Sequence, residues 1–366
     1  MDPEDVGCLS LCNHSLLETL GRDVWRPLCP ESTYTQKQFL TRLERDIPTH
    51  FFCHTCSALH LGEQVNPPGP KYFVHKKIPC DDQYLVDNLS VITDAHPRES
   101  AYRFIYFHVK LAMKRHYYGP EHGISTESLF FTEVHDNISN TTLLSAEARI
   151  CEGPRLCMRF QTWAVAYAPD AEAFVAEPKF LSVCEHINMK GDVLPQMVKL
   201  AFGKLKSGTP VAPKTLTCES CYVDYQLEMK QVGSPDNFSL VITKWLDLGA
   251  GLTAMDKKWL RYTFRTTFYG TQQPGIAMAL FESAPGPSLD SITQTNNSYL
   301  VGDRYKVLME RWAWCYIKQY GKWSTAMKRR TAVHYFLRSG IILGFIVGMI
   351  CVIVITVIDN KRKRDS

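Results

Sequence analysis

The sequence predicts an α+β soluble body of mixed helices and antiparallel strands, followed by one C-terminal transmembrane helix. The N-terminal part holds amphipathic segments, and strands of alternating polarity follow residue 207. Residues 339–358 form an apolar run without any charge. With 366 residues, 45% of them hydrophobic, the chain is long enough to bury a large core.

The first predicted elements are helical. Residues 5–20 and 36–45 place their apolar side chains at helical spacing, and Pro48 is a stop signal for the second segment. Residues 102–118 predict a helix or a strand, because their β-branched and aromatic side chains suit both. Residues 157–167 have strand character.

A β-hairpin is predicted after a linker at residues 207–214. Apolar and polar side chains alternate over residues 222–229, as in a strand with one exposed face. A turn at residues 233–236 leads to a second strand at 238–245. A helix rich in aromatic residues is predicted for 303–320.

These elements divide the chain into five segments. They are a helical segment (1–30), a Cys/His-containing N-terminal part of the body (31–206), a C-terminal part with the hairpin (207–327), a transmembrane helix (339–358) and a basic tail (359–366).

The positive charge is concentrated at the C-terminal end. The net charge is +4, and residues 328–366 hold eight basic and two acidic residues, which gives +6 there and 4 − 6 = −2 for the rest. A slightly acidic body argues against a general nucleic-acid-binding surface.

The apolar run from residue 339 to 358 predicts a single membrane span. A helix of this length covers about 30 Å, the thickness of the hydrocarbon layer. Without an N-terminal signal peptide, this predicts a tail-anchored protein with a cytosolic body, in either the endoplasmic reticulum or the mitochondrial outer membrane. Six Asn-x-Ser/Thr sequons would fit a lumenal body instead. The lipid bilayer is one predicted partner, and self-association through small residues of the span is another: Gly340, Gly344 and Gly348.

Thirteen cysteines spread over a long chain argue for metal ligands or buried thiols rather than a disulfide scaffold. Cys184 and His186 form a C-x-H pair, and Cys218 and Cys221 a C-x2-C pair, which together offer four soft ligands for a structural zinc ion. A second candidate zinc site contains Cys53 and Cys56, and its further ligands are to be found among His60, His75 and Cys80. The alternative for both groups is buried free cysteine.

The sequence contains no motif of a common catalytic site. A G-x-S-x-G nucleophile elbow, an H-E-x-x-H zinc motif, a Walker A loop and the kinase signatures are all absent. We therefore predict no catalytic residue, no cofactor-binding residue apart from the zinc ligands, and no enzyme.

The N-terminal third resembles a large group of fungal F-box-like proteins. The motifs that carry the resemblance are Pro3–Asp5, Cys8–Gly21, Trp25, Phe39–Pro48 (FLTRLERDIP), Cys53–His60 (CHTCSALH) and Pro79–Cys80. Weaker similarity continues through Arg115–Gly123, Cys184–His186, Cys218–Cys221 and Trp245–Gly249. The Leu-Pro that opens the first helix of the box in this group is missing, so residues 1–30 resemble a degenerate, N-terminally truncated box.

This resemblance implies a helical hook that binds a Skp1-type adaptor of a cullin ubiquitin ligase. The remainder of the body would then recruit a substrate, so the expected function is a membrane-anchored protein-interaction module. Two alternatives remain at this point: a single-pass membrane scaffold without a ubiquitin-ligase role, and an enzyme.

Overall fold

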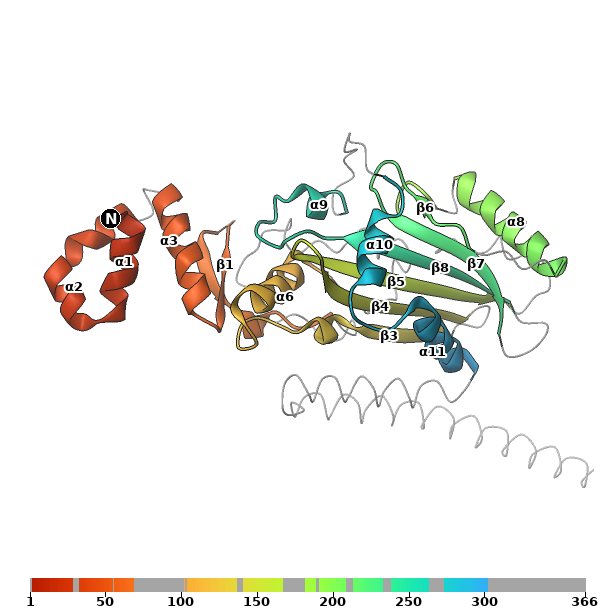
Figure 1. Ribbon diagram of the computed structural model, residues 1–366, viewed down its shortest axis with the longest axis horizontal. Coiled ribbons are helices and arrows are strands. Elements are labelled where there is room, and N and C mark those ends of the chain that lie inside the picture. Colours follow the sequence, from red (N-terminus) through yellow and green to blue (C-terminus); the bar gives the residue numbers. More distant parts are fainter. Residues whose placement is uncertain are drawn as a thin grey trace, which may run out of the picture. The chain divides into compact units, whose positions relative to one another are not determined.

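The computed structural model describes residues 2–28, 33–54, 56–68, 102, 104–136, 141–166, 182–188, 191–208, 213–232, 238–262 and 273–301. These residues all belong to one compact unit, Met1–Arg311. The unit has an α+β fold with a two-stranded and a six-stranded antiparallel sheet (Figure 1).

Four helical elements form the N-terminal part: α1 (Pro3–Cys12), α2 (His14–Leu20), the 3₁₀ helix η1 (Arg22–Leu28) and α3 (Thr33–Asp46). The predicted helical segment at 5–20 is therefore confirmed, with a break at Asn13. The Asn13 side chain accepts a hydrogen bond from the backbone N–H of residue 15 at 2.8 Å and so caps α2. Helix α1 packs against α2, η1 and α3.

A short hairpin follows α3. Strand β1 (His50–Cys53) pairs with β2 (Ala58–Leu61), and the 3₁₀ helix η2 (Gly62–Gln64) comes next. The next described helix along the chain is α6 (Tyr106–Tyr118), which resolves the predicted helix-or-strand segment at 102–118 in favour of a helix.

Buried cations of α6 connect it to α3 and β1. Lys110 Nζ lies 3.0 Å from a carboxylate oxygen of Glu44, and both side chains are almost fully buried. Lys114 Nζ donates hydrogen bonds to the carbonyl oxygens of Ile47, at 2.7 Å, and of His50. A side chain of α6 therefore satisfies one carbonyl group just after α3 and one at the start of β1.

The larger sheet has the strand order β3-β4-β5-β8-β7-β6, and all its pairs are antiparallel. Its strands are β3 (Phe131–Asp136), β4 (Thr141–Cys151), β5 (Arg155–Ala166), β6 (Leu216–Thr217), β7 (Asp224–Gln231) and β8 (Phe238–Asp247). The predicted strand at 157–167 is β5, and the predicted hairpin of residues 222–245 is confirmed as β7 and β8. Strands from both sides of residue 207 thus share one sheet.

Both faces of this sheet are covered. Alternate side chains of β5 point to opposite faces: Met158 and Phe160 join the main core with α6, whereas Cys157 and Trp163 pack on the other face. Helices α10 (Ile276–Ser283) and α11 (Leu289–Val301) lie across that second face (Figure 1). The remaining elements are η3 (Thr126–Leu129), α8 (Val193–Lys206), which contacts β7, and α9 (Lys257–Leu260).

The predicted fold class is corrected in one respect, its transmembrane helix. In the described part of the chain, no helix has the length and apolar character needed to cross a membrane. The longest helices there, α3 and α8, have 14 residues each, and such a helix rises only about 21 Å. The predicted span at 339–358 lies outside the described residues, as does the predicted helix at 303–320.

Candidate metal centres

Four predicted zinc ligands come together at the edge of the large sheet. The ligand atoms of Cys184, His186, Cys218 and Cys221 all lie within 4.8 Å of one another. We call this group the sheet-edge cluster. The three cysteines are buried and belong to the main core, whereas His186 is exposed.

A tight loop presents the first pair of ligands. A β-bridge joins Ser182 to Asn188, and inside it the backbone N–H of Val183 donates to the carbonyl oxygen of Ile187 at 2.8 Å. The N–H of Ile187 donates back to the carbonyl oxygen of Cys184 at 3.2 Å. These bonds fold the C-x-H sequence back on itself, so both side chains of the pair face the same cluster.

A turn between β6 and β7 presents the second pair. The backbone N–H of Tyr222 donates to the carbonyl oxygen of Cys218 at 2.7 Å, and the N–H of Cys218 donates to the carbonyl oxygen of Val223 at 3.0 Å. Tyr222 has a φ of 57°, a left-handed conformation that is uncommon for a residue with a side chain. The Arg261 guanidinium lies 4.8 Å from the centroid of the Tyr222 ring. The turn brings both thiols of the C-x2-C pair to one side.

The three thiols of the sheet-edge cluster perturb one another. Hydrogen bonds with Cys184 and then Cys221, together with backbone N–H groups of the turn, lower the pKa of Cys218 to about 2. The pKa of Cys184 is raised to about 12 by its hydrogen bond with Cys218 and by burial. The pKa of Cys221 is raised as well. One thiolate is thus favoured and further ionisation opposed, which is the situation a bound divalent cation would relieve.

A second group lies on the β1–β2 hairpin. The ligand atoms of Cys53, Cys56 and His60 also lie within 4.8 Å of one another, and we call them the hairpin cluster. Cys53 ends β1, Cys56 lies in the turn, and His60 is in β2, where it pairs with Phe51 of β1. The other two candidates for this site, His75 and Cys80, lie outside the described residues.

The hairpin cluster combines buried and exposed ligands. Cys53 and His60 are buried, whereas Cys56 is exposed. Cys56 Sγ lies 3.0 Å from His60 Nε2, and burial lowers the pKa of His60, which favours the neutral imidazole that metals require. His54 of the same C-x2-C motif points elsewhere, with its Nε2 atom 3.1 Å from the carbonyl oxygen of Leu252.

Both clusters have the donor set and the spacing of a metal site. Thiolate and imidazole are soft ligands, and a tetrahedral ion with Zn–S bonds of about 2.3 Å places its sulfur ligands about 3.8 Å apart. Separations within 4.8 Å are compatible with this geometry. The structure therefore contains Cys/His clusters that could bind a metal ion, one with four ligands and one with three described ligands.

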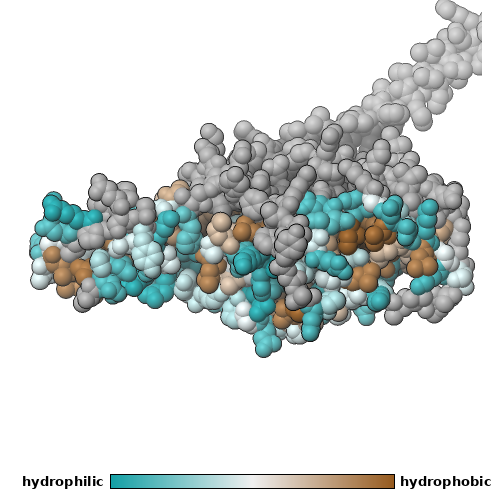
Figure 2. Space-filling model, turned by 90° about the horizontal axis from the view of Figure 1, so that it is seen from above, coloured by the Kyte–Doolittle hydropathy of each residue, from teal (hydrophilic) through white to brown (hydrophobic). Residues whose placement is uncertain are grey.

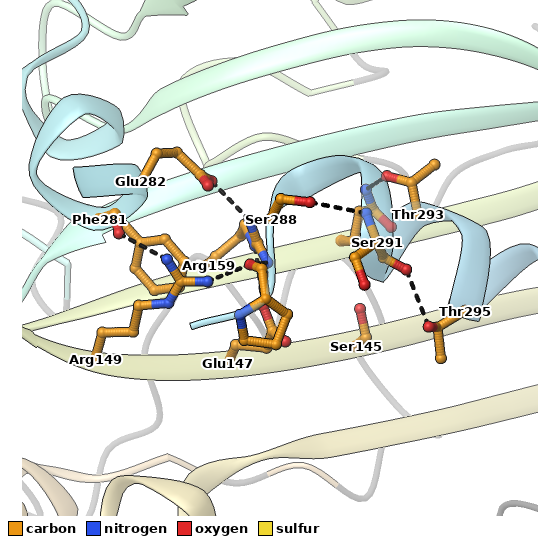
Figure 3. Close-up of polar contacts among 12 residues, drawn as sticks. Ser145, Glu147, Arg149, Arg159, Phe281, Glu282, Ser288, Ser291, Thr293 and Thr295 are labelled. Atoms are coloured by element: carbon orange, nitrogen blue, oxygen red, sulfur yellow. Dashed lines mark hydrogen bonds and ion pairs between the residues drawn. The ribbon is translucent and has the colours of Figure 1, made fainter. Parts of the chain in front are cut away.

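The structure also contains a polar layer that sequence reasoning missed, between the large sheet and α10 (Figure 3). Arg159 of β5 is fully buried; its Nε atom donates to Glu147 of β4 at 3.1 Å, and its Nη1 atom donates to Glu282 of α10 at 2.7 Å. Arg149 donates to the carbonyl oxygen of Phe281 at 2.9 Å and to carbonyl groups of the following turn. Both guanidinium groups lie over the Phe281 ring, 4.2 and 5.0 Å from its centroid.

The same layer continues under α11. Asn296 Nδ2 donates to Ser145 Oγ and to Gln161 Oε1, both at 2.7 Å. Gln161 Nε2 donates in turn to Thr293 Oγ1 at 2.8 Å and to Thr243 Oγ1 at 3.2 Å. These contacts fasten α10 and α11 to the sheet, which gives the layer a structural role. Its sequence signal is the set of polar residues at alternate positions in the middle of the two strands: Ser145, Glu147 and Arg149 in β4, and Arg159 and Gln161 in β5.

The remaining predicted site residues are the glycines of the span, Gly340, Gly344 and Gly348, which lie outside the described residues. The search for similar proteins gives no result: no family model, no curated protein and no solved structure matches this chain.

Proposed function

We propose that this chain is a zinc-stabilised protein-interaction module that acts by binding rather than by catalysis. The observation that carries the zinc proposal is the sheet-edge cluster, in which two pairs of ligands from separate loops lie within 4.8 Å of one another. Four protein ligands would complete a tetrahedral shell, as in structural zinc sites, and leave no position for a substrate. The hairpin cluster would hold a second ion through Cys53, Cys56 and His60.

A zinc ion would act here by joining two loops. The loop at 182–188 and the turn at 218–222 have few residues of regular structure, and the thiols of the cluster are part of the main core. Because the ligands lie far apart in the unfolded chain, the free energy of metal binding contributes to folding. We therefore expect chelation of the ion to loosen this edge of the sheet.

Cobalt substitution tests the sheet-edge site. Co²⁺ bound by three thiolates and an imidazole in a tetrahedron gives intense thiolate-to-metal charge-transfer bands and visible d–d bands. We expect these bands to weaken in Cys218→Ser and to persist in Cys12→Ser, a change at an exposed thiol outside both clusters. Spectra of octahedral Co²⁺ in the wild-type chain would contradict the proposal.

The proposed partner of the N-terminal helices is a Skp1-type adaptor, which would make the chain a substrate receptor of a cullin ubiquitin ligase. The supporting observation is that leucines remain exposed on α1 and α2, namely Leu9, Leu11, Leu16 and Leu20. Figure 2 shows hydrophobic residues at the surface of this end of the described chain. Exposed leucines on neighbouring helices are the side chains that a partner protein would bury.

The packing of α1, η1 and α3 is stabilised by buried contacts between these helices. Phe39 of α3 is buried, and its ring lies edge-on to Trp25 with 5.9 Å between centroids. A side chain at Gly7 of α1 would come within 2.6 Å of Leu28, so α1 lies directly against η1. Arg42 of α3 also pairs with acidic residues of α1. The exposed leucines therefore lie on helices whose other side chains pack against one another.

Co-precipitation of the full chain with a Skp1-type adaptor tests this proposal. Since each buried leucine contributes about 1.5–3 kcal/mol, we expect Leu11→Asp/Leu16→Asp to weaken binding by more than about tenfold. The matched control is Leu200→Asp, a change at an exposed leucine of α8, which should bind like the wild type. Absence of adaptor from the wild-type precipitate would refute the adaptor proposal and leave the zinc proposal in place.

A further inference from the structure

We propose that the hairpin cluster is an oxidation-controlled zinc site, in which hydrogen peroxide converts Cys53 and Cys56 to a disulfide and the ion is released. The sheet-edge cluster would keep its ion under the same conditions. This inference rests on the proposed function in one respect, the presence of zinc in the hairpin cluster. It adds a chemical modification site and a regulation of that site.

The first argument is the contrast in exposure between the two clusters. Among the ligands of the sheet-edge cluster, all three cysteines are buried, and the exposed ligand is a histidine, which peroxide does not oxidise readily. In the hairpin cluster the exposed ligand is the thiol of Cys56. Oxidation of cysteine requires an accessible sulfur with thiolate character. Peroxide in solution therefore reaches a ligand sulfur of the hairpin cluster first.

The second argument is the position of a partner thiol. Cys53 is separated from Cys56 by two residues, and its sulfur lies within 4.8 Å of the Cys56 sulfur. C-x2-C pairs can close a disulfide within one turn, and sulfur atoms at this separation need only a local change to reach bonding distance. Ser57, directly after Cys56, has a φ of 52°, so the turn already folds the chain back tightly. Cys53 is thus the resolving thiol.

The third argument is the imidazole beside the exposed sulfur. His60 Nε2 lies 3.0 Å from Cys56 Sγ, and its ring packs against Phe51 with 5.7 Å between centroids. The hairpin therefore places an imidazole, an accessible sulfur and a second sulfur in one small cluster.

The chemistry balances with hydrogen peroxide as the oxidant. The Cys56 sulfur attacks one peroxide oxygen, the O–O bond breaks, hydroxide leaves, and Cys56 becomes a sulfenic acid. The Cys53 sulfur then attacks the Cys56 sulfur and expels the second hydroxide, which forms the S–S bond. Two protons from solvent convert the hydroxides to water, and two electrons have passed from the thiolates to peroxide. Two of the three described ligands have then lost their charge, which leaves His60 as the one described ligand that can still hold the ion.

Release of this ion would act on the position of the N-terminal helices. The hairpin is a two-stranded sheet of four-residue strands, a structure too small to be stable alone. It follows α3 directly. Lys114 of α6 donates to the carbonyl groups of Ile47, just after α3, and of His50, the first residue of β1. Loosening the hairpin would therefore weaken one attachment of the proposed adaptor-binding helices to the body, while the buried Lys110–Glu44 pair between α6 and α3 would remain.

The experiment follows zinc release and disulfide formation together in the full chain. The chain is first analysed for zinc and is then treated with hydrogen peroxide in the presence of a chromogenic zinc chelator. Trypsin should produce a peptide of residues 46–71 that contains Cys53 and Cys56 and no other cysteine. We expect release of one of two ions, and a loss of the mass of two hydrogen atoms from this peptide alone.

The controls separate the possible failures. Cys12→Ser, which removes an exposed thiol of α1, should release zinc as the wild type does, and Cys56→Ser should contain one ion and release none. Two ions at the start with no release, or release without the disulfide in peptide 46–71, would overturn the redox inference alone. A starting content of one ion with an intact sheet-edge site would refute zinc in the hairpin cluster, and the inference with it.

Discussion

Glu147→Gln is a sharp perturbation of the polar layer, because it keeps the size of the side chain and removes its charge. Glu147 accepts two hydrogen bonds from the Arg159 guanidinium, through Nε at 3.1 Å and through Nη2. The Arg159 side chain is 1% exposed and that of Glu147 is 5% exposed. Water therefore cannot replace the lost charge, and Arg159 would be left with Glu282, whose side chain is 27% exposed.

The expected loss of stability follows from these two contacts. A hydrogen bond to a charged group contributes about 1.5–3 kcal/mol, and a neutral one about 0.5–1.5 kcal/mol. If the glutamine oxygen still accepts both hydrogen bonds, each bond changes from a charged to a neutral acceptor and contributes about 1–1.5 kcal/mol less. We therefore expect Glu147→Gln to lower the free energy of unfolding by about 2–3 kcal/mol, somewhat below the 3–5 kcal/mol typical of breaking a buried ion pair completely.

Urea unfolding monitored by tryptophan fluorescence measures this change, because Trp163 and Trp245 are fully buried on the same face of the sheet. The matched control is Glu228→Gln on β7, where the carboxylate lies 3.0 Å from Lys230 in a partly exposed pair. The control should change the free energy of unfolding by less than about 0.5 kcal/mol. Equal effects of the two substitutions would refute a special contribution from the buried pair.

Two further predictions concern other parts of the fold. Burial lowers the pKa of Lys114 to about 8 from its usual 10.5, so the unfolded chain binds more protons than the folded chain between these pH values. The free energy of unfolding of the wild type should therefore rise from pH 8 to 10.5 relative to that of Lys114→Met. Urea unfolding that gives parallel stabilities for the two chains over this range would contradict the prediction. Gly251→Ala should cost at least about 1 kcal/mol more in urea unfolding than Gly208→Ala. Both glycines have a φ near 65°, but only at Gly251 would a Cβ come within 2.9 Å of Met113, and equal costs would show that crowding contributes nothing.

Much of the secondary structure follows from local patterns. The alternation at residues 222–229 predicted a strand, and the structure places β7 there, paired with β8 as a hairpin. Residues 102–118 gave an ambiguous pattern for a physical reason: nine consecutive residues of α6, Tyr106–Lys114, are buried. A helix that is buried all round lacks the polar face that would give a period of 3.6 residues.

The partners of each element could not be read from local patterns. Polar residues at alternate positions in the middle of β4 and β5 are typical of strands with one face in water. Here α10 and α11 cover that face, and Glu147, Arg149 and Arg159 are buried under them. Only the tertiary arrangement distinguishes a solvated polar face from a buried polar layer.

The candidate metal ligands were largely accessible from spacing. The C-x-H and C-x2-C pairs each need only one tight turn to aim two ligands at one point, and the structure forms both turns. The sheet then brings the two pairs together. Spacing was less informative for the hairpin cluster, because His54 lies within the motif yet points to Leu252, whereas His60 is placed beside Cys56 by the pairing of β1 and β2.

The most direct test of the central claim is the zinc content of the purified full chain, measured by mass spectrometry of the metal after exhaustive dialysis. We predict two zinc ions per chain, one in the sheet-edge cluster and one in the hairpin cluster. The double variant Cys218→Ser/Cys221→Ser should hold one ion, while Cys12→Ser should still hold two. A wild-type content below one ion per chain, or an unchanged content in the double variant, would contradict the assignment of zinc to the sheet-edge cluster.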